Sequence, residues 1–270
     1  MANTSSPIIF LSGAGGGTPD LNLLRPGDDD PTCFEVISYP AWKSFVAVDF
    51  SAEAFVADLV ARIAEKTSGP IRIVGLSIGG HLGYGAALRL RAMGREVAGL
   101  CAIDSFMVAS SAPSAGWQRR ALKEGFDLLS RCRFGDLARV LRSKFWRALL
   151  RLSGGRLPQL LQRICSRSWL SSGLLFDPVL EQELSMRLLI REVAPWIASL
   201  DREPVAVLDA PAVLLRTKSS SGDDPAWRRR CPQLKIVEIE GQHHTLFEPE
   251  NAATLRRAFL AATRDWREMR

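Results

Sequence analysis

The chain has 270 residues, is 47% hydrophobic and carries a formal net charge of +6, which suits one large globular domain or two small ones. It holds no apolar run near the roughly 18 residues that span a membrane, and its N-terminus lacks the features of a secretory signal. Five scattered cysteines without a C-x-x-C pair make a disulfide framework or a zinc site unexpected, so we expect a cytoplasmic protein without cofactor or metal.

The first half of the chain alternates between strand and helix patterns. Four strands are expected from short apolar or alternating runs, at residues 7–11, 33–38, 71–76 and 97–104. A helix is expected over residues 51–66, where Ser51 can cap the first turn, and another over residues 79–93, before Gly94. This succession is typical of a parallel sheet with crossover helices.

The alternation stops after the fourth strand. Residues 106–203 show no convincing strand and consist of amphipathic stretches rich in Leu and Arg. Two more strands, at 211–217 and 234–240, and a closing helix then follow. We therefore predict the α/β class, with a mostly parallel core formed by residues 1–105 and 204–270 and a helical lid insertion over 106–203.

Positive charge is concentrated in this insertion. Residues 115–170 contain thirteen Lys and Arg against three acidic residues, so the window carries +10. A docking surface for an acidic partner and an ordinary solvated helical face explain it equally well. No groove-reading element supports nucleic-acid binding, and an anionic membrane surface is a minor alternative.

The stretch VGLSIGGH, at residues 74–81, sets a serine among glycines between an expected strand and an expected helix. Gly75, Ser77 and Gly79 match G-x-S-x-G, a sharp turn that exposes a serine hydroxyl at the C-terminal edge of a sheet. Its glycines are required because side chains would collide with the neighbouring strand and helix. The context predicts Ser77 as a nucleophile, and the alternative is a glycine-rich turn with an incidental serine.

A serine nucleophile needs a general base. His243 and His244 follow the last strand and are the two candidates, of which one is expected to act. His81 stands only four residues after Ser77, on the following helix. We expect it to point away from the hydroxyl and to be structural.

The base in turn needs an acid that orients it. Asp104 ends the strand after the nucleophile helix, so it should emerge at the same sheet edge as Ser77. Asp223 and Asp224 follow the next core strand, although their GDDP sequence also suits a plain turn. The chain order Ser, Asp, His holds for either location.

An acyl-transfer intermediate also needs backbone N–H donors for its oxyanion. Ile78, directly after Ser77, supplies one candidate. The glycine-rich loop at residues 12–17, after the first strand, is placed to supply the second. This loop lacks the Lys-Ser/Thr ending of a P-loop and the spacing of a dinucleotide fingerprint, so it does not indicate nucleotide binding.

Taken in order, SGAGGG, GLSIGGH, AIDSF and GQHHTLFEP resemble the thioesterase domains of polyketide, non-ribosomal peptide and fatty acid synthases. The resemblance covers nearly the whole chain apart from the insertion and implies the α/β-hydrolase fold. It implies a serine thioesterase that releases an acyl, polyketide or peptidyl chain through an acyl-Ser77 intermediate, by hydrolysis or cyclisation. The chain would arrive as a thioester on the phosphopantetheine of a carrier protein, which could dock on residues 115–170, or on coenzyme A.

The resemblance also assigns roles. His243, the first histidine after Gly-x, would be the base, and Asp104, of the Asp-Ser pair, the acid. The next strand runs into residues 216–219 without an acid at the position that the stand-alone editing members use. Ala14 would give the second oxyanion N–H, although the loop begins with SG where the family commonly has His-Pro or Pro-Pro.

Two alternatives stand beside this interpretation. A carboxylesterase or a stand-alone editing thioesterase would use the same residues. An α/β-hydrolase scaffold that only binds a ligand belongs to a different class. The presence of Ser77, Asp104 and His243 together argues against the binding scaffold, because a silent scaffold need not retain all three.

Overall fold

The computed structural model describes residues 7–27, 32–47, 49–106, 134–153, 156, 158–160 and 178–268. Much of the basic window at 115–170, and part of the predicted insertion, therefore lie outside the described residues. Among the described residues, the structure contains no helix with the length and apolar character needed to cross a membrane.

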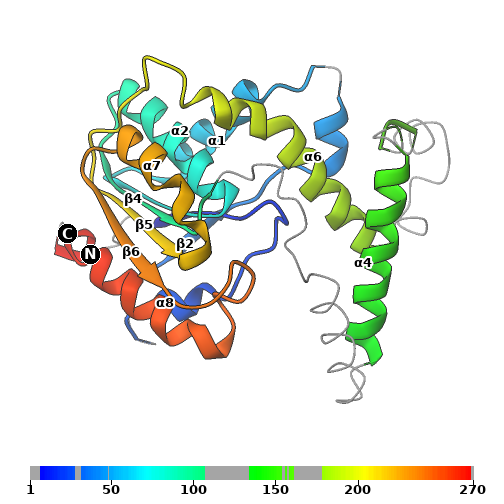
Figure 1. Ribbon diagram of the computed structural model, residues 1–270. Coiled ribbons are helices and arrows are strands. Elements are labelled where there is room, and N and C mark those ends of the chain that lie inside the picture. The colour runs from blue at the N-terminus through cyan, green and yellow to red at the C-terminus, as the bar shows by residue number, and fades with distance from the viewer. Residues whose placement is uncertain are drawn as a thin grey trace. The chain divides into compact units, whose positions relative to one another are not determined.

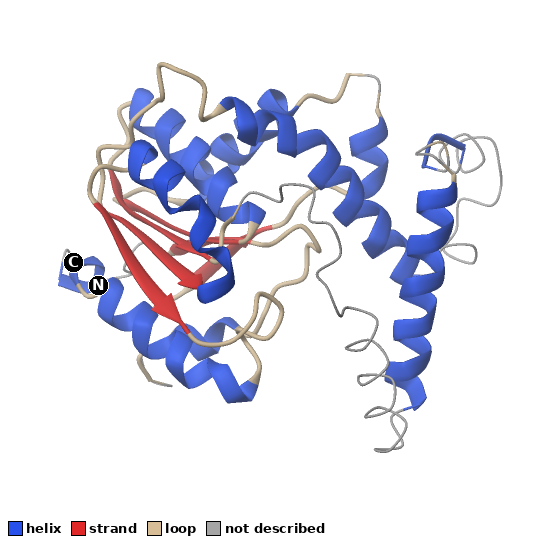
Figure 2. Ribbon diagram, in the orientation of Figure 1, coloured by secondary structure: helices blue, strands red, loops and turns tan. Residues whose placement is uncertain are grey.

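Six parallel strands form one sheet, which confirms the predicted α/β class (Figure 2). In chain order they are β1 (Ile8–Leu11), β2 (Phe34–Ile37), β3 (Ile71–Leu76), β4 (Val97–Ile103), β5 (Ala212–Thr217) and β6 (Leu234–Ile239). Their order across the sheet is β2-β1-β3-β4-β5-β6. Because the strands are parallel, their C-terminal ends meet at one edge, and β3, β4 and β5 are consecutive neighbours there.

The longer helices include the two predicted in the first half of the chain. They are α1 (Ala52–Lys66), α2 (Ile78–Ala92), α4 (Phe134–Leu152), α6 (Pro178–Ser199), α7 (Asp224–Arg230) and α8 (Pro249–Ala262). Shorter turns of helix are η1 (Leu21–Leu24), η2 (Trp42–Val46), η4 (Lys218–Asp223) and α9 (Asp265–Glu268). The Ser51 hydroxyl accepts the Ala54 N–H at 3.0 Å, which confirms the predicted cap of α1.

Helices cover both faces of the sheet: α1 and α2 on one, α8 on the other (Figure 1). The face under α8 packs Phe10, Val74 and Cys101 against Leu255 and Phe259 of that helix. The alternate strand residues face α2, so the central strands are apolar on both sides. This double burial explains why the strands appear in the sequence as continuous apolar runs.

The chain forms two compact units. Residues 1–39, 50–107 and 190–270 make up the first, which contains the sheet, and residues 40–49 and 108–189 make up the second. The division falls within α6. In the second unit, Arg147 of α4 pairs with the buried Glu183 of α6 at 2.7 Å.

Candidate active site

The predicted nucleophile, Ser77, occupies the turn between β3 and α2. Its φ of 56° lies in the left-handed region, which is strained for a residue other than glycine. A Cβ at Gly75 would lie 2.3 Å from the backbone of Gly79, so only glycine allows this approach of strand and helix. The Ser77 N–H donates to the Ile103 carbonyl at 2.8 Å and so ties the turn to the end of β4.

The glycine-rich loop after β1 lies beside this turn. A Cβ at Gly79 would overlap the carbonyl oxygens of Leu11 and Ser12, so the start of α2 rests directly on the end of β1. At Gly13, an added Cβ would lie 3.5 Å from the Ser77 Cβ. The turn that contains Ala14 therefore begins next to Ser77, while Ile78 is the first residue of α2.

Asp104, directly after β4, is fully buried and hydrogen-bonded to a histidine. Its Oδ2 accepts from His243 Nδ1 at 2.8 Å. Its Oδ1 accepts from the Thr217 N–H at 2.8 Å and from the Ser220 hydroxyl at 2.6 Å. Burial opposes ionisation of this carboxyl, but the hydrogen bonds that it accepts outweigh burial and lower the pKa of Asp104.

An ionised Asp104 determines which nitrogen of His243 carries the proton. Nδ1–H donates to the carboxylate, which leaves the lone pair on Nε2 available to accept a proton. His243 lies in the segment between β6 and α8, half-buried, with the Phe106 ring edge-on at 4.9 Å between centroids. The ring is therefore oriented by one polar and one aromatic neighbour.

The segment that carries His243 is held by the start of α8. The Gln242 N–H donates to Thr245 Oγ1 at 3.1 Å, and the Thr245 N–H donates back to the Gln242 carbonyl at 2.8 Å. Asn251, in the first turns of α8, donates to the Thr245 carbonyl at 2.9 Å. His244, the other candidate base, is exposed.

The sequence-predicted residues are thus brought together in part. Asp104 and His243 are in contact, and Ser77 is attached through its backbone to the residue before Asp104. Within the described chain, no hydrogen bond joins the Ser77 hydroxyl to His243. Such bonds are commonly long before substrate binds. The alternative acid Asp224 pairs with Arg216 at 3.0 Å, and the Asp223 side chain lies outside the described residues.

Sequence reasoning missed Thr217 and Ser220, the two donors to Asp104 Oδ1. Their only sequence signal is a run of small hydroxyl residues, T-K-S-S-S, after a strand. Such a run is also typical of a plain polar loop. In the described residues, no group of three or more His, Cys, Asp or Glu side chains could hold a metal ion.

His81 is buried in a second polar cluster, and no hydrogen bond between described residues links its side chain to Ser77, Asp104 or His243. Its Nδ1 accepts from Arg230 at 2.8 Å, and its ring stacks on Trp227 at 5.1 Å. Arg230, itself fully buried, pairs with Asp201 at 2.9 Å. Burial, together with the Arg230 charge, lowers the pKa of His81 to about 3. This histidine is therefore neutral and structural.

We expect His81 to make the protein less stable as the pH falls below its ordinary pKa of 6.5. The unfolded chain binds a proton at this histidine from there downward, whereas the folded chain does so only near pH 3. The free energy of unfolding should therefore fall by about 2 kcal/mol between pH 7 and pH 5. His81→Asn keeps an acceptor for Arg230 but cannot titrate. In this variant, the free energy of unfolding measured in urea should lose the part of its pH dependence that His81 causes.

The exposed His244 offers the matched control for this measurement. His244→Asn removes a histidine at an exposed position, and the slope in His81→Asn is compared with the slope in this variant. An unchanged slope in His81→Asn would contradict the assignment of a neutral, buried His81.

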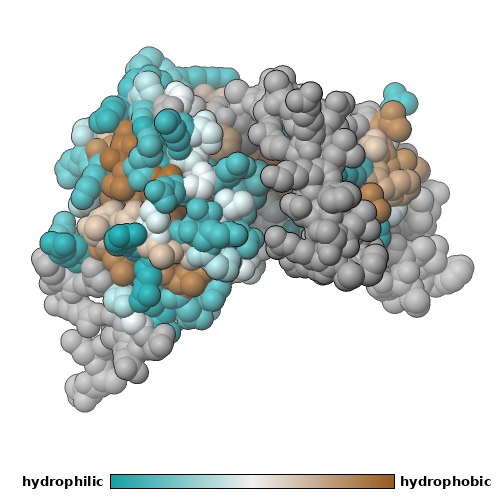
Figure 3. Space-filling view, turned by 60° about the horizontal axis from the view of Figure 1, so that its bottom comes forward, coloured by the Kyte–Doolittle hydropathy of each residue, from teal (hydrophilic) through white to brown (hydrophobic). Residues whose placement is uncertain are grey.

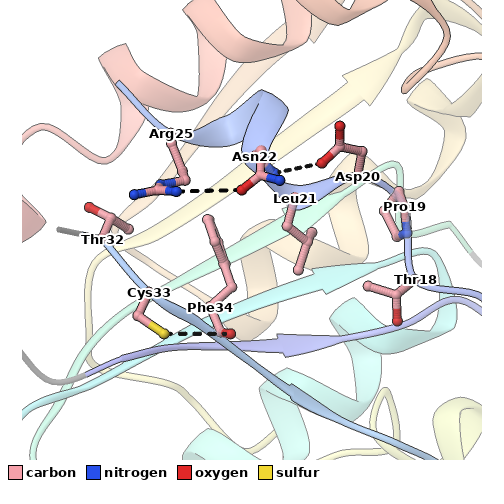
Figure 4. Close-up of a pocket in the computed structure, with 9 residues that line it drawn as sticks. All are labelled: Thr18, Pro19, Asp20, Leu21, Asn22, Arg25, Thr32, Cys33 and Phe34. Atoms are coloured by element: carbon pink, nitrogen blue, oxygen red, sulfur yellow. Dashed lines mark hydrogen bonds between the residues drawn. The ribbon is translucent and has the colours of Figure 1, made fainter. Parts of the chain in front are cut away.

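Figure 4 shows a cavity of about 510 Å³ at another place, between η1 and the start of β2. Residues 18–22, Arg25 and residues 32–34 line it. The Asp20 carboxylate accepts the Asn22 N–H at 3.0 Å, which caps η1. None of the sequence-predicted site residues lines this cavity.

Comparison with known proteins agrees with the fold. A family model described as "Alpha/beta hydrolase family" matches residues 8–258. Comparison with curated proteins finds no match. Several solved structures are similar over nearly the whole chain.

Among them is the NocB thioesterase domain, in covalent complex with a fluorophosphonate nocardicin G analog, with 19% identity and a TM-score of 0.57 over 96% of this chain and 95% of that chain. The Vlm2 thioesterase domain bound with a dodecadepsipeptide has 16% identity and a TM-score of 0.58, over 95% and 92%. A four-domain nonribosomal peptide synthetase, AB3403, has 20% identity and a TM-score of 0.55, over 96% of this chain and 19% of that chain. These similarities show a fold like that of the NocB and Vlm2 thioesterase domains, in agreement with the alpha/beta hydrolase family model.

Proposed function

The chain belongs to the alpha/beta hydrolase family, and we propose that it is a serine thioesterase. Its substrate would be an acyl, polyketide or peptidyl chain held as a thioester on the phosphopantetheine of a carrier protein or on coenzyme A. The observation that supports this most is the hydrogen bond between buried Asp104 and His243, next to a strained serine at the same sheet edge. The likeness of the fold to thioesterase domains supports the choice of thioester over other acyl substrates.

In the proposed reaction, His243 Nε2 removes the proton from the Ser77 hydroxyl while the Ser77 Oγ attacks the carbonyl carbon of the thioester. The tetrahedral intermediate collapses, the C–S bond breaks, and the thiol leaves with the proton from His243. A second nucleophile, activated by His243 in the same way, then attacks the acyl-serine and releases the chain. Water gives a carboxylic acid, whereas a hydroxyl or amine of the chain gives a lactone or lactam.

The surroundings of Ser77 and His243 fit the charges that this reaction creates. The ionised Asp104 stabilises the imidazolium that forms when His243 takes the proton. The Ile78 N–H, at the N-terminus of α2, and the Ala14 N–H are proposed to bind the oxyanion. The partial positive charge at the start of α2 adds to that stabilisation.

Substrate choice tests the proposal against a carboxylesterase. We expect a thioester to be turned over with a higher kcat/KM than an oxyester of the same acyl chain, compared over a series of chain lengths. A consistent preference for the oxyesters would make the protein a carboxylesterase with the same three residues.

We also propose that the basic lid at residues 115–170 docks an acidic carrier protein. In its described part, four cationic side chains are exposed, namely Arg142, Lys144, Arg147 and Arg156, of which Arg147 pairs with Glu183. The exposed apolar side chains Leu141 and Phe145 stand one turn apart on α4, next to Arg142 and Lys144 in the sequence, and hydrophobic surface on this helix is brown in Figure 3. Cations around an apolar strip suit an acidic, partly apolar partner surface, because complementary charge speeds encounter.

Charge reversal in this lid should separate carrier docking from chemistry. Lys144→Glu with Arg156→Glu is expected to raise the KM for a carrier-bound thioester about tenfold, because each reversal replaces attraction by repulsion. The same variant should act normally on a small thioester without carrier. Lys235→Glu with Arg257→Glu, at exposed positions on β6 and α8, is the matched control. Equal KM values in all three proteins would contradict docking on the lid.

A further inference from the structure

Residues at the end of β5 and in the turn after it hold Asp104 through three hydrogen bonds. The Asp104 N–H donates to the Leu215 carbonyl at 2.6 Å, and Oδ1 accepts from the Thr217 N–H and the Ser220 hydroxyl. All three partners come from β5 and the turn after it. Ser220 stands 116 residues after Asp104 in the sequence. Only Oδ2 is left to face His243.

These hydrogen bonds hold a residue whose backbone has an uncommon, positive φ angle. Asp104 has a φ of 45°, in the left-handed region that is uncommon for residues other than glycine, although Asp and Asn adopt it more often than most. A strained conformation of this kind persists only where the surroundings hold it in place. The bonds from the end of β5 fix the direction of the carboxylate as well as the backbone that carries it.

The Ser220 hydroxyl has one proton and three oxygens within hydrogen-bond distance, of which the Thr217 hydroxyl is the farthest, at 3.4 Å. Asp104 Oδ1 lies at 2.6 Å and the Thr217 carbonyl at 3.0 Å. The shorter contact goes to the charged acceptor, which forms the stronger bond. Ser220 is buried, so water does not readily replace this donor. Ser219, in contrast, is exposed and contacts the Thr217 hydroxyl at 2.9 Å.

We propose that Ser220 is a positioning residue of the active site, whose hydroxyl holds Asp104 Oδ1 so that Oδ2 orients His243. The segment after β5 contains Asp223 and Asp224, the alternative candidates for the acid. In this proposal the same segment supplies a hydrogen-bond donor to Asp104 instead. This inference rests on the proposed function, because it requires His243 to act as the base for Ser77. A purely structural Ser220 would affect stability and leave the chemistry alone.

Three variants test the inference: Ser220→Ala, Ser220→Thr and, as matched control, Ser219→Ala. Loss of a hydrogen bond to a charged group lowers a rate by roughly ten- to a hundredfold. We expect that fall in kcat for Ser220→Ala on a small thioester, with an unchanged KM. Ser220→Thr and Ser219→Ala should stay within about threefold of the wild type, since both keep a hydroxyl at position 220.

Two further readouts respond to the chemistry and not to folding. The rate at which a fluorophosphonate labels Ser77 should fall in Ser220→Ala in proportion to kcat. The downfield proton resonance of Nδ1–H in His243 should weaken or move in Ser220→Ala and stay in place in Ser220→Thr and Ser219→Ala. Thermal unfolding of each variant records any loss of fold separately.

The outcomes distinguish this inference from the proposed function. If the wild type is not labelled at Ser77, the proposed function fails. If the wild type is labelled and Ser220→Ala matches it in kcat, labelling rate and resonance, the positioning role is wrong. Equal losses in Ser220→Ala and Ser220→Thr would also overturn it, because the shape of the side chain and not its hydroxyl would then matter.

Discussion

Replacement of Ser77 by alanine is expected to lower turnover of thioesters by roughly 10⁴–10⁶-fold, because no other group in the proposed mechanism can form the acyl-enzyme. The variant should also lose all labelling by a fluorophosphonate. Its fold should persist, since the Ser77 side chain does not cap α2 and the Gly75–Gly79 contact that shapes the turn is unchanged.

Three measurements on purified protein check this result: kcat on a small thioester, intact mass after fluorophosphonate treatment, and thermal unfolding. Ser219→Ala removes a hydroxyl at an exposed position and should behave as the wild type in all three. Residual labelling of the Ser77→Ala variant would place the reactive serine elsewhere. A wild type that is neither labelled nor active would favour the α/β-hydrolase scaffold that only binds a ligand.

Asp104→Asn should have the second largest effect, a loss of roughly 10⁴-fold in kcat. The Thr217 N–H and the Ser220 hydroxyl both point at Oδ1, so the new amide will place its carbonyl oxygen there. Its NH₂ group then faces His243 and donates to Nδ1. The histidine is left with its proton on Nε2, where it cannot accept the proton of Ser77.

The matched controls for this variant are the two aspartates that the sequence left open as the acid. Asp224→Asn breaks an ion pair with Arg216, whose two side chains are 15% and 20% exposed. It should change kcat by less than about fivefold, since a partly exposed pair contributes little and Asp224 has no role in the proposed reaction. Asp223→Asn is expected to be as mild. The acid assignment would be reversed if either of these variants lost most of its activity while Asp104→Asn kept it.

The parts of the fold that could be predicted from the sequence are those that depend on local patterns. Continuous apolar runs indicated the central strands because both faces of the sheet are covered. The G-x-S-x-G turn was recognisable because steric overlap at Gly75 and Gly79 excludes any other residue. The cap of α1 by Ser51 is equally local.

The rest of the site depends on neighbours that meet only in the folded chain. Ser220 and Asp104 come together because β4 and β5 pair across a long insertion, and nothing distinguishes Ser220 from Ser219 in the sequence. The position of His81 was anticipated in outline, but its partner Arg230 lies 149 residues away. The strained φ of Asp104 follows from the same tertiary contacts and has no local signature.

Detection of the acyl-enzyme tests most directly whether the acyl group is transferred through Ser77. Wild-type protein is mixed with an acyl thioester, quenched in acid during turnover, digested and measured by mass spectrometry. We expect the peptide containing Ser77 to gain the mass of the acyl group and the corresponding peptide of the Ser77→Ala variant to gain none. Continued thioester cleavage with no acyl adduct on Ser77, or with an adduct on another residue, would contradict it.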